Sequence, residues 1–510
     1  MTTVPDTGFT DGEWHRLHPL TPLLRGGIAF VAILGIIIVN LRDIVIEIIF
    51  GGYDGEGEPL VWLLESGYLW LGVGAVILGL VAFIVGFWLW WRMQTFRITN
   101  EVVEVRSGML FRTNRRGRLD RIQGVNIVRP FLARLVGVAK LEVNVAGQDA
   151  NIKLEYLGSA AADELRRDVL RLASGTQAAA VEYAVLAEGA PPTGLVEQRI
   201  SEMLASELAP DLAPPASVVT LNLGRLIGSI VLSGFTIFLI GVIVALVIAA
   251  TRSPFFLVGF VPAIIGMGGY YISKFTRSLR YSIAGTPDGV RVGFGLLSTT
   301  NETLPPGRIH SVQVRQPLLW RLFGWWEIKV NRAGKSSSQG AAGQANTTIL
   351  PVGNLSDVHK VLALLLPELT DEESTALLER GMVSKGGDAT IDPGFTNSPR
   401  RARILRWFSV RRNGFALLPS AVLLRKGAIW RELVVVPLAR VQSVALHEGP
   451  LYRVLRVASL HFHTVAGPIV PTLGAIDRAD AVRFFREAVD AAVLSSTSDT
   501  SHRWRSAERS

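Results

Sequence analysis

The fold is decided by a stretch of sequence that occurs three times. Its centre reads Arg-Ile-Gln-Gly-Val at residues 121–125, Arg-Ile-His-Ser-Val at 308–312 and Arg-Val-Gln-Ser-Val at 440–444. In each copy a glycine lies 13 residues before the first arginine, and a second arginine lies 13 residues after it. The shared positions are Gly108, Arg121 and Arg134; Gly295, Arg308 and Arg321; and Gly427, Arg440 and Arg453. Agreement at this many fixed offsets indicates an internal repeat. Any single motif must therefore be interpreted as part of this repeat.

The third copy diverges from the first two. The first two share a second glycine, Gly137 and Gly324, at the position where the third copy has Arg456. They also share a proline nine residues after the first arginine, whereas Pro450 of the third copy comes one position later. The third copy therefore keeps the frame of the repeat but not all of its turn residues.

Each copy predicts short strands closed by one helix. Apolar and polar residues alternate in 101–106, 123–128 and 140–145, which is the pattern of half-buried strands. The repeated glycine fits a turn between strands. Residues 130–135 predict a helical turn that packs Phe131 and Leu132 inward. Amphipathic closing helices are expected at 163–172, 356–366 and 477–493. The expected domain is a small β-barrel or sandwich capped by its C-terminal helix.

Four apolar stretches have the length of membrane spans. They lie at about 24–41, 68–91, 226–250 and 254–272, and about 20 apolar residues cross a bilayer core of roughly 30 Å. Only three residues separate the last two, so they predict a tight hairpin. The polar segment before the first stretch lacks the basic start of a signal peptide, so we expect that stretch to be retained. The fold class is thus an α+β membrane protein with four transmembrane helices in two hairpins.

The basic residues predict the orientation of these helices. The segment between the first two stretches carries one arginine and six acidic residues, whereas residues 92–121 carry eight arginines. Because basic residues stay on the cytoplasmic side, both long segments and both termini are expected in the cytoplasm. We attribute the formal net charge of +9 first to basic cytoplasmic segments that orient the helices and that contact anionic lipid. Nucleic acid is not an expected partner, because the arginines follow the membrane edge and not an aromatic-lined strand face.

These observations predict an alternation of hairpins and domains along the chain. The expected order is a cytoplasmic segment at 1–23, hairpin 1 at 24–91, domain 1 at 96–175, a linker at 176–225, hairpin 2 at 226–272, domain 2 at 279–366, a linker at 367–405, domain 3 at 410–493 and a disordered tail at 494–510.

The repeated glycine turn, Arg-Ile-x-x-Val strand and Leu-x-Arg-Leu-x-Gly segment resemble the bacterial PH-like (pleckstrin-homology-like) domain family of the YdbT type. The resemblance covers the chain apart from linkers and tails. It implies a seven-stranded, partly open barrel capped by a C-terminal helix, no catalytic chemistry and a place in the bacterial cytoplasmic membrane. Similar proteins are described as membrane proteins, some of them tied to resistance against membrane-active peptides and hence to envelope stress.

The basic run at 112–118 is the candidate binding site. It contains Arg112, Arg115, Arg116 and Arg118 and is expected in a loop close to the end of the second span. A basic residue beside an anionic leaflet contributes on the order of 1 kcal/mol. The run therefore predicts a site for anionic lipid headgroups, with a solvated loop that only enforces topology as the alternative.

The recurring arginines are interpreted as structural. Arg121, Arg308 and Arg440 are expected to pair with a carboxylate or to cap carbonyls within their own domains, with Asp163, Asp357 and Asp480 as candidate partners. The same role is expected of Arg134, Arg321 and Arg453. His461 and His463 share one strand face, but a zinc site needs further ligands. No cofactor or metal is expected, and the cysteine-free sequence excludes thiol chemistry.

The leading functional hypothesis is a membrane-anchored scaffold and not an enzyme. Three cytoplasmic PH-like domains would bind a protein partner, one another, a second copy of the chain or lipid headgroups. Tethering to the bilayer raises the effective concentration of such domains, so weak contacts suffice. The alternative is a transport or export component whose four helices form a path.

Overall fold

The structure is a computed structural model that describes residues 92–174 and 219–498, most of 9–21 and scattered positions between 78 and 91. The gaps inside the two long ranges are residues 100, 109–111, 146–150, 252, 254, 280, 287–288, 297, 305–306, 333–346 and 388–391. The span expected at 24–41, most of that at 68–91, the linker at 176–218 and the end of the tail lie outside the described residues. The chain divides into two compact units.

The first unit holds most of the first repeat. One antiparallel sheet has the order β1-β2-β3-β4. Its strands are β1 (His15–Arg16), β2 (Thr95–Ile98), β3 (Val102–Ser107) and β4 (Thr113–Arg118). The short helix α4 (Phe131–Leu135), the neighbouring strands β6 (Val138–Val145) and β7 (Ile152–Gly158) and the closing helix α5 (Ser159–Ser174) follow. Most of β5 (Ile122–Arg129) and the end of β6 are grouped with the second unit.

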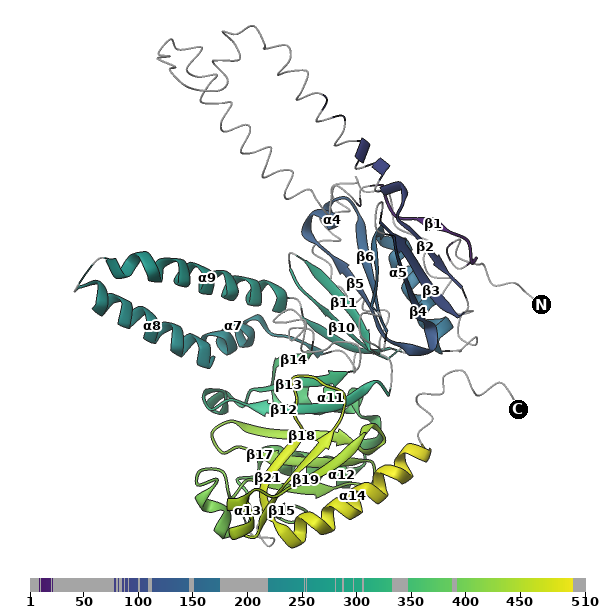
Figure 1. Cartoon of the computed structure of the whole chain (residues 1–510). Helices are drawn as coiled ribbons and strands as arrows, with labels where there is room; N and C mark the ends of the chain where they lie inside the picture. Colours follow the sequence, from purple (N-terminus) through teal and green to yellow (C-terminus); the bar gives the residue numbers. More distant parts are fainter. Residues whose placement is uncertain are drawn as a thin grey trace. The chain divides into compact units, whose positions relative to one another are not determined.

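The second unit holds the second and third repeats (Figure 1). The second repeat consists of β8 (Val219–Thr220), β9 (Ser282–Thr286), β10 (Gly289–Phe294), β11 (Thr299–Leu304), β12 (Ile309–Gln316), β13 (Trp326–Arg332), β14 (Thr348–Gly353) and α11 (Leu355–Leu365). The third consists of β15 (Thr396–Asn397), β16 (Gly414–Leu417), β17 (Ala421–Lys426), β18 (Arg431–Pro437), β19 (Ser443–His447), β20 (Val457–His463), β21 (Thr472–Asp477) and α14 (Arg478–Ser498). Each repeat thus has seven strands among the described residues, followed by a closing helix.

The first strand of every repeat lies outside the domain boundaries expected from the sequence. β1 pairs with β2, β8 with β9 and β15 with β16. In the first two repeats the expected hairpins at 24–91 and 226–272 stand between these paired strands in the sequence. A hairpin is therefore an insertion within a PH-like sheet and not a segment that precedes the domain.

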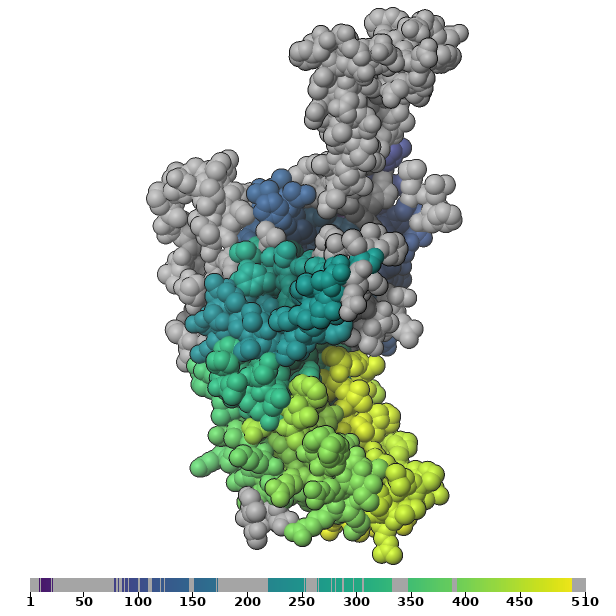
Figure 2. Space-filling view, turned by 90° about the vertical axis from the view of Figure 1, so that its left-hand side faces the viewer, coloured from purple at the N-terminus to yellow at the C-terminus, as the bar shows by residue number. Residues whose placement is uncertain are grey.

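The second and third repeats share a sheet. β12 pairs with β18, in a register that places Val312 opposite Val435 and Gln316 opposite Arg431. One sheet consequently runs β14-β13-β12-β18-β17-β16-β15. In the space-filling view the green atoms of the second repeat lie against the yellow-green atoms of the third (Figure 2). A single buried core spans both repeats and includes Val358 of α11 and Leu433 of β18.

The recurring Arg321 and the strand residue Asn331 of the second repeat stabilise this junction. Arg321 donates hydrogen bonds to the carbonyl oxygens of Ala428 and Ile429, in the turn between β17 and β18. Asn331 donates to the carbonyl of Ile469 (2.7 Å) and accepts from its amide (3.0 Å). The structural role expected for Arg321 is found, but it caps carbonyls of the next repeat and not of its own.

A neutral histidine lies at the same junction. Burial, together with the positive charges of Arg440 and Arg308, lowers the pKa of His310 on β12 to about 4. The imidazole is therefore uncharged near neutral pH, and the junction does not bring together three positive groups.

In each repeat the second recurring arginine lies in a short helical turn. These turns are α4, the 3-10 helix η4 (Leu319–Phe323) and α13 (Pro450–Val454). The prediction that Phe131 and Leu132 pack inward is wrong, because they are 43% and 47% exposed. The corresponding turns expose Leu322 and Val454. The buried residues of the first turn are Ala133 and Arg134. These two neighbours occupy the inward side of a five-residue helix, which leaves Phe131 and Leu132 outside.

The segment 367–405, expected to be a linker, contains folded elements of the third repeat. Helix α12 (Glu372–Val383) buries Leu378 and Met382 in the shared core. Asp371 caps its first turn by accepting a hydrogen bond from the Ser374 amide (2.9 Å). The 3-10 helices η6 (Pro367–Leu369) and η7 (Arg400–Ile404) flank it.

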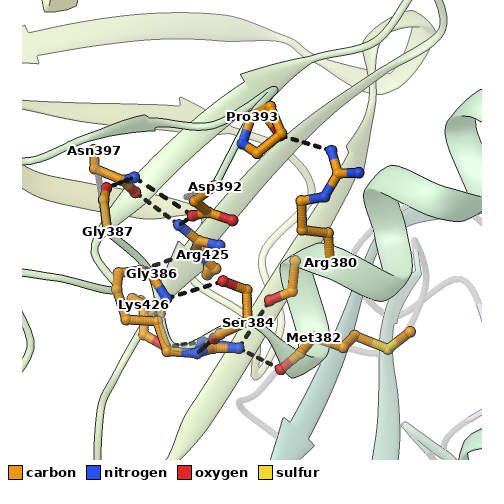
Figure 3. A network of polar contacts seen from close by, with 12 residues as sticks. Arg380, Met382, Ser384, Gly386, Gly387, Asp392, Pro393, Asn397, Arg425 and Lys426 are labelled. Carbon is orange, nitrogen blue, oxygen red and sulfur yellow. Dashed lines mark hydrogen bonds and ion pairs between the residues drawn. The ribbon is translucent and has the colours of Figure 1, made fainter. Parts of the chain in front are cut away.

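A buried network ties this segment to the sheet (Figure 3). Arg425 and Asp392 form an ion pair in which both side chains are 0% exposed. Arg425 also donates to the Asn397 side chain (2.7 Å) and to the Arg412 carbonyl (3.1 Å). Arg412 in turn donates to the carbonyls of Gly381 (2.8 Å) and Met382 (2.6 Å), at the end of α12. The network thereby joins α12, β15 and β17.

We expect Asp392→Asn to destabilise the third repeat by about 3–5 kcal/mol, because it leaves the Arg425 charge buried without its counter-ion. Burial raises the pKa of Asp392, but the hydrogen bond and charge of Arg425 outweigh it and hold the pKa below its ordinary value of 3.8. The stabilisation is therefore complete above that value and is lost as the pH falls through the folded-state pKa. Unfolding of the detergent-solubilised chain should show this acid dependence in the wild type and not in the variant.

The double variant Asp392→Asn/Arg425→Met is the control, since it removes both charges. It should recover part of the lost stability. A double variant as unstable as the single one would show that the charge pair is not the cause.

The residue that follows the short helical turn has a left-handed backbone conformation in every repeat. Gly137, Gly324 and Arg456 occupy the same position with φ of 70°, 64° and 50°. Because this conformation costs a residue with a Cβ on the order of 1 kcal/mol, Arg456→Gly should stabilise the third repeat by up to about that amount. Slower hydrogen exchange of the β20 amides would report it.

Gly324→Ala is the matched reverse change. An added Cβ meets no atom within 4 Å there, so only the backbone conformation is tested. This variant should exchange faster in β13. Unaltered exchange in both variants would contradict the argument.

Candidate functional site

The insertion between β8 and β9 is an apolar helical hairpin. It consists of α7 (Leu223–Val231), α8 (Gly234–Ala250) and α9 (Phe255–Ser278). Helices α8 and α9 run side by side away from the strands (Figure 1). No single helix among the described residues has both the length and the hydropathy of a membrane span, but α7 and α8, which are bent by 50° where they meet, reach it together.

Local sequence signals account for the bend. Asn222 caps α7 by accepting a hydrogen bond from the Gly224 amide (2.8 Å), and Ser233 caps α8 by accepting from the Thr236 amide (3.3 Å). Because Ser233 starts a new helix directly after α7 ends, the chain forms two helices with a bend between them and not one straight helix. The Tyr271 hydroxyl donates to Thr236 (2.8 Å) and so joins α9 to the start of α8.

The base of the hairpin is anchored in the second repeat. Leu226 of α7 is buried against Trp320 of η4 and Val352 of β14. Arg225 forms an ion pair with Asp357 of the closing helix (2.9 Å). The hairpin is thus held to its domain through the short helical turn and through the closing helix.

The surface of α8 is apolar and exposed. Its sequence contains no ionisable residue. The exposed side chains include Phe235, Ile237, Phe238, Ile240, Val244, Val247 and Ile248. A contiguous exposed apolar surface of this kind marks a contact with a membrane or a protein.

The candidate arginines lie in the first unit and not in a loop. Arg115, Arg116 and Arg118 belong to strand β4, which pairs with β3 over its whole length. The expectation of a loop missed this strand because its residues are mostly charged and carry no apolar alternation. β4 is the edge of its sheet, and a charged edge strand resists pairing with other chains.

The four arginines differ in what they contact. Arg116 pairs with Glu104 of β3 (2.5 Å), which also receives a hydrogen bond from Arg97 of β2 (3.0 Å). The Glu104 side chain is only 3% exposed, so these arginines neutralise a buried carboxylate. Arg112, in contrast, is exposed just before the strand. Arg116 therefore has a structural role that Arg112 does not share.

The recurring glycines take the conformation that the turn prediction requires. Gly108, Gly295 and Gly427 have φ of 108°, 107° and 79°. A Cβ at Gly427 would lie 1.9 Å from the Trp430 carbonyl oxygen. These glycines are needed for the backbone turn.

The aspartates of the closing helices have arginine partners from outside the recurring set. Asp163 pairs with Arg129 (2.6 Å), and Asp480 pairs with Arg483 (2.8 Å). Asp163 and Asp357 thus tie their closing helices to other parts of the fold through arginines that were not expected as partners. The Asp480–Arg483 pair lies within α14 itself.

Three stretches of the chain, residues 48–173, 225–369 and 396–492, match the family described as Bacterial PH domain, and together they make up more than half of the chain. The chain belongs to this family. The UPF0699 transmembrane protein YdbT of Bacillus subtilis (strain 168) is 21% identical over 386 residues, which cover 72% of this chain and 72% of that protein. The resemblance to bacterial PH-like proteins of the YdbT type is thereby confirmed.

The bacterial PH domains show no constellation of metal ligands in the described part of the chain, where no three His, Cys, Asp or Glu side chains come together. His461 and His463 stack with ring centroids 4.1 Å apart. Burial, with His463 and His447 nearby, lowers the pKa of His461.

We expect Arg116→Ser and Arg112→Ser to differ in stability. The first change should cost about 1–3 kcal/mol, because the buried Glu104 loses a charged partner. The second should stay within about 0.5 kcal/mol, as usual for an exposed position. Thermal unfolding of the detergent-solubilised chain compares them. An equal loss of stability in the two variants would contradict a structural role for Arg116 that Arg112 lacks.

Proposed function

We propose that the protein is a membrane-anchored scaffold that presents three cytoplasmic PH-like domains to a protein partner or to anionic lipid. The observation that carries the proposal is the exposed apolar hairpin α7–α9 inserted between the first two strands of a PH-like sheet. The transmembrane relative from Bacillus subtilis supports membrane association of this chain as well.

The four expected spans form two anchors in this proposal. Helices α7 and α8 together cover the span expected at 226–250, and α9 covers the span expected at 254–272. The spans expected at 24–41 and 68–91 would form the other anchor, since they occupy the same place in the first repeat as α7–α9 in the second. The location proposed is the bacterial cytoplasmic membrane, with both termini in the cytoplasm.

The shared sheet gives the scaffold its rigidity. Because β12 and β18 pair directly and one core spans both repeats, the second and third domains are held as one body beneath the second anchor. Ligand surfaces on these two domains would then have a fixed spacing. Fixed presentation lowers the entropic cost of binding a partner that touches both.

The basic run of the first repeat is the proposed lipid contact. Arg112 is the exposed member, and Arg115 and Arg118 lie on the edge strand β4. A role in envelope stress or in resistance to membrane-active peptides is proposed from the family resemblance alone.

The topology can be tested with single cysteines, since the chain has none of its own. Ser253 lies in the turn between α8 and α9, and Ser420 lies in the turn between β16 and β17, each with a partly exposed side chain. In intact cells a membrane-impermeant maleimide should label Ser253→Cys, whereas Ser420→Cys should react only after permeabilisation. The control is the cysteine-free chain, which should take up no label. Protection of both positions in intact cells, or reaction of both, would contradict the proposed crossing.

A further inference from the structure

The third repeat lacks a hairpin but keeps the place for one. In the second repeat the hairpin connects β8 to β9, whereas in the third repeat residues 398–413 connect β15 to β16. This short connection, the tip loop, therefore occupies the position from which α7–α9 leaves the second repeat.

The tip loop also packs like the base of the hairpin. Leu226 of α7 packs on Trp320 of the short turn η4. In the third repeat Leu405 of the tip loop and Tyr452 of the short turn α13 pack against the same buried cluster, which contains Ala402. Tyr452 stands at the repeat position of Trp320. Both the connectivity and the packing therefore make the tip loop of the third repeat equivalent to the base of the hairpin in the second.

The two ends of the tip loop are fixed. The Ser398 amide donates to the Asn413 carbonyl (2.8 Å). The Asn413 side-chain amide donates to the Ser398 hydroxyl (2.7 Å) and to the Gly474 carbonyl (2.7 Å). Arg401 pairs with Asp477 and so holds the loop to the end of β21. The tip loop is therefore an ordered loop that is held at its ends and exposes its middle.

The outward middle is apolar and aromatic. Ile404, Trp407 and Phe408 are 76%, 68% and 59% exposed, and the Trp407 and Phe408 rings lie against each other. On the adjoining turn α13, Leu451 and Val454 are exposed as well. Exposed tryptophan and phenylalanine at the tip of a domain are the residues that enter the interface of a bilayer.

The charged residues within the tip loop itself are all arginines. The tip loop contains Arg400, Arg401, Arg403, Arg406, Arg411 and Arg412 and no acidic residue. Arg403 and Arg411 are exposed, as is Arg453 on α13. Arginine around an apolar tip matches the headgroup region of an anionic leaflet, which is negative outside and apolar beneath.

We propose that the tip loop and α13 dock the third repeat on the anionic face of the bilayer, in place of the missing hairpin. Ile404, Trp407 and Phe408 enter the interface, and Arg403, Arg411 and Arg453 contact lipid phosphates. The inference rests on the proposed function, because it needs the third repeat on the side of the anionic cytoplasmic leaflet.

The test uses the full chain in lipid nanodiscs. A fluorescent maleimide on Ser409→Cys, within the tip loop, reports contact with a spin-labelled lipid that quenches it. Ser420→Cys is the matched control, because it lies in the same repeat just beyond the other end of β16. We expect quenching at position 409 in nanodiscs that contain phosphatidylglycerol, weaker quenching in pure phosphatidylcholine and none at position 420.

The arginines and aromatic residues are tested separately in the Ser409→Cys background. Each of Arg403→Ser and Arg411→Ser should lower the ratio of docked to undocked loops roughly fivefold, whereas the corresponding lysine variants should keep it. Trp407→Ala/Phe408→Ala should abolish quenching in both lipids. These positions are exposed, so the fold is kept.

Absence of quenching at position 409 in anionic nanodiscs would overturn the inference. So would a label shielded from water but untouched by the lipid quencher, since that outcome identifies a protein as the occupant. Failure of the proposed function is recognised separately, because the labelling of Ser253→Cys and Ser420→Cys in cells reports the membrane crossing without reference to the tip loop.

Discussion

The pairing of β12 with β18 is the constraint on which the second unit depends. A strand at the edge of a sheet leaves backbone donors and acceptors unpaired, and a small PH-like sheet has two such edges. The second repeat satisfies one edge with the third repeat, so the sheet, the core around Leu433 and the contacts of Arg321 and Asn331 follow from one junction. The recurring residues are thus signatures of how repeats join as much as of how each repeat folds.

An anchor inserted between the first two strands has a mechanical consequence. The chain leaves the second repeat after β8 and returns at β9, and these strands are paired. The hairpin base is also fixed by Leu226 on Trp320 and by Arg225 on Asp357. The domain cannot swing on a single flexible connection, so the direction of the anchor determines the direction of the domain. In the proposed scaffold this connection would present the domain surfaces at a defined angle to the membrane.

The sequence was sufficient for the repeat, the glycine turns, the short helical turns and the closing helices, because each has a strong local signal at a fixed offset. It was insufficient for β1, β8 and β15, since a two-residue strand has no period and its partner lies across an insertion. The strand β4 escapes prediction because half of its residues are arginine and none is apolar. The expected linker at 367–405 includes only the first half of the tip loop, although the clustered arginines and the Trp407-Phe408 pair are a signal. The junction contacts of Arg321 could not be predicted, because spacing within one repeat says nothing about the next.

The edge strands also give the basic run of the first repeat a physical reason that is independent of lipid. β11 and β18 stand at the repeat position of β4, and each lies beside a strand of the preceding repeat, β5 and β12. In the first repeat the equivalent strand β4 is the edge of its sheet among the described strands. Strand β4 reads Thr-Asn-Arg-Arg-Gly-Arg, whereas β18 reads Arg-Glu-Leu-Val-Val-Val-Pro. Arginine on β4 disfavours the edge pairing that the apolar β18 makes. Protection of the edge is compatible with the proposed lipid contact, because that contact would use the exposed Arg112 beside the strand.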